Sequence, residues 1–254
     1  MTRRRFYAPP SAFDSSLARV TLASDEARHL REVLRLKVGD EVYVFNGEGK
    51  EFECRVEAAR RDTAHLTVVR EVAAARPESP LHLNLAVALL KGEKFDLVVQ
   101  KATELGVSLV TPVVTKLADI RLRDESDVAK RLARWRRIAL EAAKQSGRAA
   151  VPDIVAPVSF ATLVLLAVAE PQSNCLMFSE RNGQSLTETK ELLTPKTTRL
   201  TALVGSEGGW TDEEIMMAGD EGWRIITLGG RTLRAETAAI AVAVLLQYLA
   251  GDLV

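Results

Sequence analysis

The sequence predicts a small β-barrel followed by an α/β domain with a mostly parallel sheet. Before residue 75, short stretches alternate apolar and polar residues, a pattern typical of strands. After residue 80, apolar strand-like segments alternate with segments of helical periodicity, which favours parallel strands covered by helices. Residues 73–80, rich in alanine and proline, separate the two patterns. We therefore expect one domain over residues 1–73 and a second over residues 80–254.

The first part contains recognisable strands, a turn and one helix. Glu41–Phe45 and Ala64–Val69 alternate as half-buried strands do. Asn46-Gly47 is a strong hairpin signal, which predicts that a strand over residues 51–56 pairs with the one before the turn. A helix is predicted over Ser24–Leu34, with the Ser24 side chain as its N-terminal cap.

The second part predicts five strands, at residues 81–90, 107–115, 174–178, 199–205 and 223–228. Apolar residues of Glu93–Leu105 recur at helical spacing, and Gly106 is a natural C-terminal stop. Asp127–Ser146 has one apolar face and is also predicted to be helical. The last three strands are each expected to lead through a turn into a helix.

Composition argues for a cytoplasmic globular protein without metal. Cys54 and Cys175 lie far apart, in no metal-ligand spacing, and the three histidines form no local cluster. No apolar run of signal-peptide length follows the basic N-terminus, and the apolar run Ala238–Leu246 is too short to span a bilayer. We therefore expect neither a metal site nor a membrane segment.

Charge is unevenly distributed although the formal net charge is zero. Residues 116–150 hold ten basic and five acidic residues, a net charge of +5, whereas residues 151–254 hold seven basic and thirteen acidic residues, a net charge of −6. A basic stretch on a neutral protein indicates a localised contact with a polyanion. A solvated helix face explains the same pattern, and charge alone does not separate the two.

Three predicted strands end in segments that suggest a ligand site, namely Ser179-Glu180, Val204–Trp210 and Leu228–Thr237. Ligands of open α/β sheets bind at the carboxyl ends of strands, and glycine lets a backbone approach a ligand closely. Two glycine-rich loops in one domain favour a nucleotide-like ligand held by main-chain atoms, although each alone is equally consistent with an ordinary turn. Neither loop fits a P-loop or a dinucleotide fingerprint.

Structural roles explain most residues after the second glycine loop. Thr211 and Glu214 form the pattern of a capping box, with Trp210 and Ile215 spaced for a hydrophobic staple. Glu207 lies inside the loop and before the cap, so no structural role explains it.

The third loop runs through Arg234 and Glu236 into a helix, Thr237–Leu249, that is apolar on all sides. Such a helix is buried on several faces, which a partner subunit can provide. Charged residues at its buried start are costly unless they are paired or functional. An intramolecular Arg234–Glu236 pair therefore remains the alternative to a catalytic role.

Together, these motifs resemble the signatures of the RsmE family, whose order and spacing agree over nearly the whole chain. The motifs that carry the resemblance are Lys91-Gly-Glu-Lys94, Gln100-Lys-Ala-Thr-Glu-Leu-Gly106, Glu141-Ala-Ala-Lys-Gln-Ser-Gly-Arg148, Val204-Gly-Ser-Glu-Gly-Gly-Trp210 and Leu228-Gly-Gly-Arg-Thr-Leu-Arg-Ala-Glu-Thr-Ala238. Ser206 stands where the family usually has proline, which predicts a slightly less rigid loop, and Thr232 stands where an aliphatic residue is usual.

The resemblance implies S-adenosylmethionine-dependent methylation of N3 of a uridine in the 16S ribosomal RNA of the small subunit. It also implies a SPOUT-type domain with a trefoil knot, a PUA-like β-barrel that helps bind RNA, and a homodimer. A positioned carboxylate and an arginine suit proton removal from N3 and stabilisation of the resulting anion. We expect Glu236 and Arg234 to be catalytic, with Glu207 as the alternative acid or base.

The remaining expected site residues fall into two groups. The cofactor is expected to contact the three loops, at Ser179, Val204, Gly205, Gly208, Gly209, Leu228, Gly229, Leu233 and Thr237. RNA is expected to contact basic and polar side chains spread over both parts of the chain, at Arg3, Arg4, Arg5, Lys91, Lys94, Arg131, Arg134, Arg137, Gln145 and Arg148.

Other functions stay open at this point. A SPOUT enzyme acting on a different RNA, or on a ribose 2′-hydroxyl, would carry similar loops. A non-catalytic RNA-binding module is disfavoured because a pure binder needs no cofactor pocket. A hydrolase or kinase is disfavoured because the nucleophile and phosphate motifs are absent from the sequence.

Overall fold

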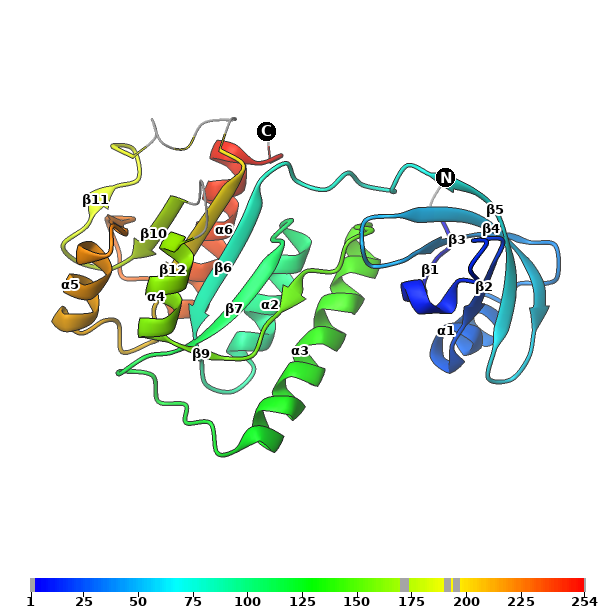
Figure 1. Ribbon diagram of the computed structural model, residues 1–254, viewed down its shortest axis with the longest axis horizontal. Helices are drawn as coiled ribbons and strands as arrows, with labels where there is room; N and C mark the ends of the chain where they lie inside the picture. Colours follow the sequence, from blue (N-terminus) through cyan, green and yellow to red (C-terminus); the bar gives the residue numbers. More distant parts are fainter. Residues whose placement is uncertain (1–2, 170–173, 190–192, 194–196, 254) are drawn as a thin grey trace. The chain divides into compact units, whose positions relative to one another are not determined.

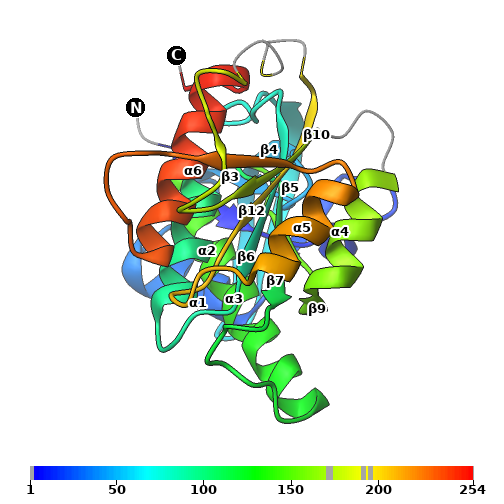
Figure 2. The same ribbon diagram turned by 90° about the vertical axis from the view of Figure 1, so that its left-hand side faces the viewer.

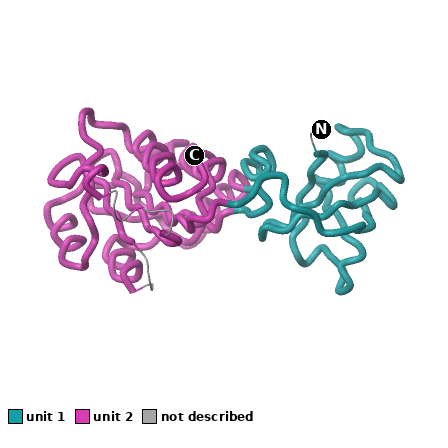
Figure 3. The backbone as a smooth tube through the Cα atoms, turned by 90° about the horizontal axis from the view of Figure 1, so that it is seen from above, with its two compact units in different colours: residues 1–78, 140–151 teal, residues 79–139, 152–254 magenta. Residues whose placement is uncertain are grey.

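The computed structural model describes residues 3–169, 174–189, 193 and 197–253. The chain divides into two units, shown in teal and magenta in Figure 3. Unit 1 comprises residues 1–78 together with 140–151, and unit 2 comprises residues 79–139 together with 152–254. The second segment of unit 1 includes the C-terminal end of the longest helix, so the chain passes twice into this unit.

Unit 1 is built on a curled five-stranded sheet with the order β1-β3-β4-β5-β2. The β1–β3 pair is parallel and the other neighbours are antiparallel. Its elements are β1 (Arg5–Tyr7), the 3-10 helix η1 (Pro10–Ala12), β2 (Arg19–Leu22), α1 (Ser24–Arg28), the π-helix η2 (His29–Val33), β3 (Glu41–Phe45), β4 (Glu51–Ala59) and β5 (Ala64–Val72).

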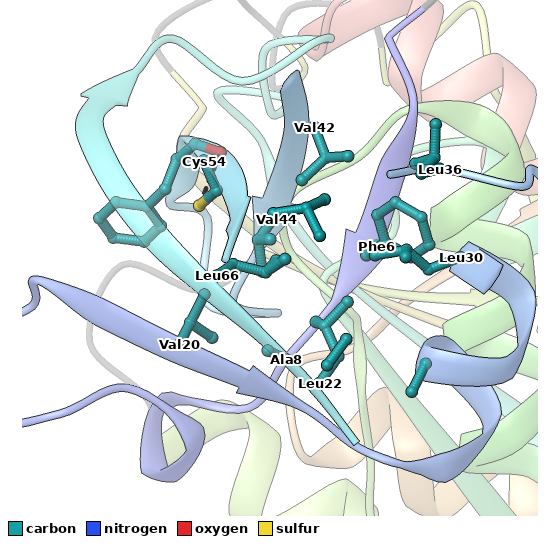
Figure 4. Packing of buried hydrophobic residues seen from close by; sticks show 14 residues of the cluster. Phe6, Ala8, Val20, Leu22, Leu30, Leu36, Val42, Val44, Cys54 and Leu66 are labelled. Atoms are coloured by element: carbon teal, nitrogen blue, oxygen red, sulfur yellow. Dashed lines mark hydrogen bonds between the residues drawn. The ribbon is translucent and has the colours of Figure 1, made fainter. Parts of the chain in front are cut away.

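Apolar side chains from the sheet and from the helical segment α1–η2 form the core of unit 1, as Figure 4 shows. Phe6, Val44 and Leu66 come from the sheet, and Leu30 packs against them from η2. Burial in this core raises the pKa of Cys54 to about 12, with a smaller contribution from the charge of Glu53. The Cys54 thiol is therefore an inert packing group.

The predicted hairpin is confirmed, and the predicted helix cap is wrong. β3 and β4 pair through a loop in which the Asn46 side chain accepts hydrogen bonds from the N–H groups of Glu48 and Lys50. Helical structure covers residues 24–33, but the cap is Ala23, whose carbonyl accepts the Ala27 N–H at 2.8 Å. The helix therefore begins at Ser24 as its first helical residue, with the cap one residue earlier than expected and without a side-chain cap.

A buried carboxylate, Glu51, holds two arginines near the N-terminus, Arg3 before β1 and Arg5 within it. Its side chain is fully buried and accepts hydrogen bonds from Arg3, from Arg5 and from the N–H of Ala75. The Arg5 guanidinium also donates to the carbonyl of Arg148 at 2.9 Å. Because the Arg5 side chain is only 8% exposed, it is a structural group of unit 1.

Unit 2 contains the rest of the secondary structure. Its elements are β6 (His82–Ala88), α2 (Lys94–Glu104), β7 (Leu109–Val114), most of α3 (Glu125–Ser146), β8 (Asp153–Ile154), β9 (Val158–Ser159), α4 (Phe160–Ala169), β10 (Asn174–Phe178), β11 (Gln184–Ser185), β12 (Arg199–Val204), α5 (Asp212–Asp220), β13 (Arg224–Thr227) and α6 (Ala235–Ala250).

The unit 2 sheet has the order β11-β13-β10-β12-β6-β7-β8, with β9 also pairing with β7 (Figure 1). Neighbouring strands are parallel, which confirms the predicted α/β class. Helices α2 and α6 cover one face, and α4 and α5 cover the other (Figure 2). The trefoil knot stays a prediction.

Helix α2 and the adjoining part of α3 agree with the sequence pattern. Gly106 follows α2 with φ +80°, the left-handed conformation that ends helices. The rings of Phe95 and Trp135 lie 4.5 Å apart, and the Trp135 indole donates to Asp96. After β10, the described residues 179–189 contain the short strand β11 and no helix, and the helix expected before β12 otherwise falls mostly on residues outside the described ranges.

We predict that Glu51→Ala destabilises the protein by about 3–5 kcal/mol, because it leaves the buried Arg5 without its counter-charge. The matched control is Glu71→Ala, which removes a pair with Lys50 in which both side chains are more than half exposed. That control should cost less than about 1 kcal/mol. Urea unfolding measures both, and equal losses would show that the Glu51 network contributes no more than a surface pair.

Candidate functional site

A cavity of about 680 Å³ lies at the carboxyl ends of β10, β12 and β13. Three loops line it, the segments 178–180, 204–209 and 227–235, together with Ala238 of α6. The parallel pairing of β10 with both β12 and β13 brings these loops to one edge of the sheet. The site thus lies where open α/β sheets bind ligands.

Most of the loop residues predicted to bind a cofactor line this cavity. They are Ser179, Val204, Gly205, Gly208, Gly209, Leu228, Gly229 and Leu233. Thr237 is not among the lining residues and is exposed on α6. Glu207 and Arg234 also line the cavity, whereas Glu236 does not.

Trp210 ties the first two loops together. Its side chain is only 2% exposed, and its indole N–H donates to the carbonyl of Phe178 at 2.8 Å. A Cβ at Gly205 would lie 3.0 Å from the indole ring, so any side chain here would press on Trp210. The predicted capping box of Thr211 and Glu214 is confirmed and fixes the start of α5 directly after Trp210.

The tight turn of the second loop is held from both sides. The N–H of Gly209, with φ +67°, donates to the carbonyl of Ser206, and the Glu180 carboxylate packs on Gly209. A Cβ at Gly208 would lie 2.7 Å from the carbonyl oxygen of Leu117. Gly208 therefore provides room for Leu117, a neighbour that no motif in the sequence indicated.

A lysine and two glutamates form a charged cluster beside the cavity. The Lys94 ammonium, at the start of α2, lies 2.8 Å from Oε1 of Glu207 and 3.9 Å from Oε2 of Glu236. The Glu236 side chain is only 12% exposed, and its Oε2 has no hydrogen-bond partner among the described residues. Arg234 is exposed and makes no ion pair with a described residue, so Lys94 replaces it as the ionic neighbour of Glu236.

The environment of Glu207 favours its ionised form. Partial burial raises the pKa of Glu207. Hydrogen bonds from Lys94 and from the residue's own N–H, together with the charges of Lys94 and Lys91, lower it by more than burial raises it. The pKa of Glu207 is therefore below its ordinary value. A carboxylate with a lowered pKa is a weak proton acceptor near neutral pH.

The residues expected to contact RNA differ in their exposure and in whether they already form ion pairs. Arg148 is buried and pairs with Glu78. The Arg5 side chain is likewise buried, beside Glu51. Arg134 donates to Asp96, which with Glu93 raises the pKa of its guanidinium.

Others keep exposed surface despite a partner. Arg3, 30% exposed, binds Glu51, Arg131 pairs with Asp127 one helical turn away, and Lys91 pairs with Asp119. Arg4 and Arg137 are exposed and form no ion pair with the part of the chain that the structure describes, and the uncharged Gln145 is exposed as well.

Two site features escaped prediction from the sequence. The Ser206 hydroxyl is buried and has no hydrogen-bond partner within the described residues. Arg181 donates to the carbonyl of Trp210 at 2.8 Å and pairs with Asp212, which fastens the first loop to the start of α5. The position of Arg181 two residues after Ser179 was the available signal, since it follows a predicted strand end.

Neither a metal-binding cluster nor a membrane-spanning helix occurs among the described residues. No group of three or more histidine, cysteine or carboxylate side chains in the described ranges is arranged to hold a metal ion. Among the described helices, none combines the length and apolar character needed to cross a membrane.

Comparison with known proteins adds family information to this geometry. Residues 77–247 match the family described as RNA methyltransferase domain, and residues 22–69 match the RNA methyltransferase PUA domain. A ribosomal RNA small subunit methyltransferase E from Synechocystis is 33% identical over 94% of this chain and 75% of its own length. One of the same name from Bacillus subtilis is 28% identical over 91% and 92%.

Solved structures are similar over the full length. A ribosomal RNA small subunit methyltransferase E from Neisseria gonorrhoeae, bound to S-adenosyl methionine, is 31% identical with a TM-score of 0.86, and 100% of each chain is covered. A methyltransferase from Legionella pneumophila, in complex with the same cofactor, is 30% identical with a TM-score of 0.86 and equal coverage.

The residues of the cavity fit S-adenosylmethionine. The glycine-rich loops expose main-chain groups, and the buried Ser206 hydroxyl lacks a partner that a polar ligand atom would supply. Apolar side chains such as Val204, Leu228 and Leu233 line the same space and suit an adenine ring.

We predict that Gly205→Ala weakens S-adenosylmethionine binding at least about tenfold, roughly 1.4 kcal/mol, because the new methyl group pushes the Trp210 ring out of place. Isothermal titration calorimetry measures the affinity. The matched control is Gly219→Ala on α5, where a Cβ meets nothing within 4 Å. Equal affinities of the two variants would show that the Gly205–Trp210 contact does not shape the cofactor site.

Proposed function

Because the chain belongs to the family of ribosomal RNA small subunit methyltransferase E, we propose that it methylates N3 of a uridine in 16S ribosomal RNA. S-adenosylmethionine is the methyl donor. The observation that carries the proposal is the charged cluster of Lys94, Glu207 and Glu236, which reaches the cavity through Glu207. A second substrate held at this cluster would meet the cofactor at the edge of the cofactor pocket.

The chemistry needs positioning and one proton acceptor. The cofactor supplies an electrophilic methyl group on a sulfonium. Glu236 accepts the N3 proton of the uracil as the N3–carbon bond forms and the sulfur–carbon bond breaks. Arg234, exposed at the mouth of the cavity, stabilises the negative charge that develops on the uracil carbonyl oxygens.

Glu236 is a better proton acceptor than Glu207. Glu207 has a lowered pKa and already accepts a hydrogen bond from Lys94 at 2.8 Å. Oε2 of Glu236 has no hydrogen-bond partner among the described residues, so it is free to accept the N3 proton. Glu207 then serves to hold Lys94 in place.

We assign RNA contact first to the exposed cations, Arg4 of unit 1 and Arg137 of α3, with Lys91 near the loop that holds Glu207. The uridine must leave its stack to reach a cavity of this kind. The match of residues 22–69 to an RNA methyltransferase PUA domain supports a part for unit 1 in this contact.

We also propose that the protein is a cytoplasmic homodimer formed through α6. We further propose that the chain forms the trefoil knot of SPOUT enzymes. Val244 is 39% exposed and Tyr248 is 60% exposed on α6, one turn apart. Exposed apolar side chains of this size on one face favour a protein partner. A second copy of α6 offers the same face, as a twofold dimer requires.

Mapping of the methylated nucleoside tests the function. Small ribosomal subunits lacking the modification are incubated with the purified protein and S-adenosylmethionine, and the 16S RNA is digested for mass spectrometry. We expect N3-methyluridine at one position. Methylation on a ribose, or on another RNA only, would contradict the proposal and indicate a different activity of the same fold.

We predict that Glu236→Gln lowers the single-turnover rate by about 10²–10⁴-fold, the usual contribution of a positioned acid or base. Cofactor affinity and melting temperature should change little. The control is Glu213→Gln, a carboxylate of α5 that is mostly exposed. A near wild-type rate for Glu236→Gln would remove Glu236 from the chemistry, and unfolding of this variant would make its role structural.

We predict that Val244→Lys converts the protein to monomers and abolishes methylation, because a charge on the α6 face cannot be buried against a second copy. Sedimentation at micromolar concentration measures the state. Leu166→Lys on α4, 63% exposed in the wild type, is the control and should leave the state unchanged. A monomeric wild type would contradict the dimer.

A further inference from the structure

Lys94 presents more hydrogen-bond donors than the described residues use. An ammonium group has three N–H donors. Glu207 takes one at 2.8 Å, whereas Oε2 of Glu236 lies 3.9 Å away, beyond hydrogen-bond length. Ionic attraction holds the ammonium near Glu236, yet the two groups do not satisfy each other.

The resulting arrangement is a free donor beside a free acceptor. Oε2 of Glu236 is buried and has no hydrogen-bond partner within the described ranges. A buried acceptor without a partner is destabilising, and a ligand that donates to it would recover that loss. The pair therefore favours a ligand edge that offers one acceptor next to one donor.

The Watson–Crick edge of uracil has this pattern, since N3–H donates and the carbonyl oxygen on either side accepts. Cytosine differs at two of these groups, because its N3 carries no proton and an amino donor replaces O4, whereas its O2 remains an acceptor. We propose that Lys94 is the residue that selects uracil, donating to O4, the carbonyl that cytosine replaces with an amino group, while Glu236 faces the N3–H. The inference rests on the proposed function and adds how the target base is chosen.

The same contact assists the reaction. When the N3 proton moves to Glu236, the negative charge of the uracil spreads to the neighbouring carbonyl oxygens, and the new bond forms between N3 and the methyl carbon. A cation already placed at one of these oxygens stabilises the charge without reorganisation. Glu207 acts through Lys94 as a positioning residue, because its hydrogen bond fixes where the ammonium points.

The test uses 16S RNA carrying either uridine or cytidine at the methylated position, under single-turnover conditions with saturating RNA and cofactor. Lys94→Met should lower the uridine rate about 10²–10³-fold, the loss typical of one preorganised donor. The slow rate on cytidine should stay unchanged, so discrimination between the bases falls by the same factor. Lys94→Arg, which keeps the cation, should restore the uridine rate to within about tenfold of wild type.

The control is Lys101→Met, which removes a lysine from the same helix, paired there with Glu104, and should keep the wild-type rate. Affinities for RNA and cofactor and the melting temperature are measured for every variant. An unchanged uridine rate in Lys94→Met overturns the inference, as does weaker RNA affinity with an unchanged saturated rate, which would mark a phosphate contact. Loss of folding or of cofactor binding in both Lys94 variants overturns it too, by making the role structural.

These outcomes are distinct from failure of the proposed function. If the wild-type protein places no methyl group on N3 of uridine, the function itself is wrong. If wild type methylates N3 and the Lys94 variants do not differ from it in base choice, only the inference about Lys94 is wrong.

Discussion

The site depends on the parallel pairing of β10 with β12 on one side and β13 on the other. This pairing forces three chain segments that are distant in sequence to turn at the same edge of the sheet. Trp210 then fixes the distance between two of them, because its indole binds the Phe178 carbonyl and packs on Gly205. With the strand ends fixed, main-chain groups of the loops can serve as ligands with little freedom to lose on binding.

The charged cluster of Lys94, Glu207 and Glu236 brings the groups proposed for methyl transfer to these fixed loops. Glu207 comes from a loop of the cavity, Glu236 from the first turn of α6, and Lys94 from the first turn of α2. Each helix start is fixed by packing, since α2 and α6 lie on the same face of the sheet (Figure 2). The unsatisfied Glu236 oxygen is a local cost that folding alone does not explain, which fits a group kept for a substrate.

Periodicity and glycine positions were enough to predict the five longer strands of unit 2, its helices α2, α3, α5 and α6, and the loops around the cavity, but not α4 or the short strands β8, β9 and β11. The helix expected after β10 is not found among residues 179–189, where β11 follows instead, and the rest of that stretch lies mostly outside the described residues. Side-chain partners were harder to foresee. Lys94 and Glu207 lie 113 positions apart, and no local pattern indicates that they meet. Arg5 resembled a surface cation because nothing in the sequence reveals that Glu51, 46 residues later, is fully buried beside it. Such pairings arise from topology, which short motifs do not encode.

A crystal structure with S-adenosylmethionine bound tests the central claim most directly. The account predicts that the adenosine part lies among the loops at 178–180, 204–209 and 227–235, with the methyl group directed toward the border formed by Glu236 and Lys94. The Ser206 hydroxyl should gain a partner from the cofactor or from a water that it holds. A cofactor bound elsewhere, or a methyl group directed away from Glu236 and Lys94, would contradict the account.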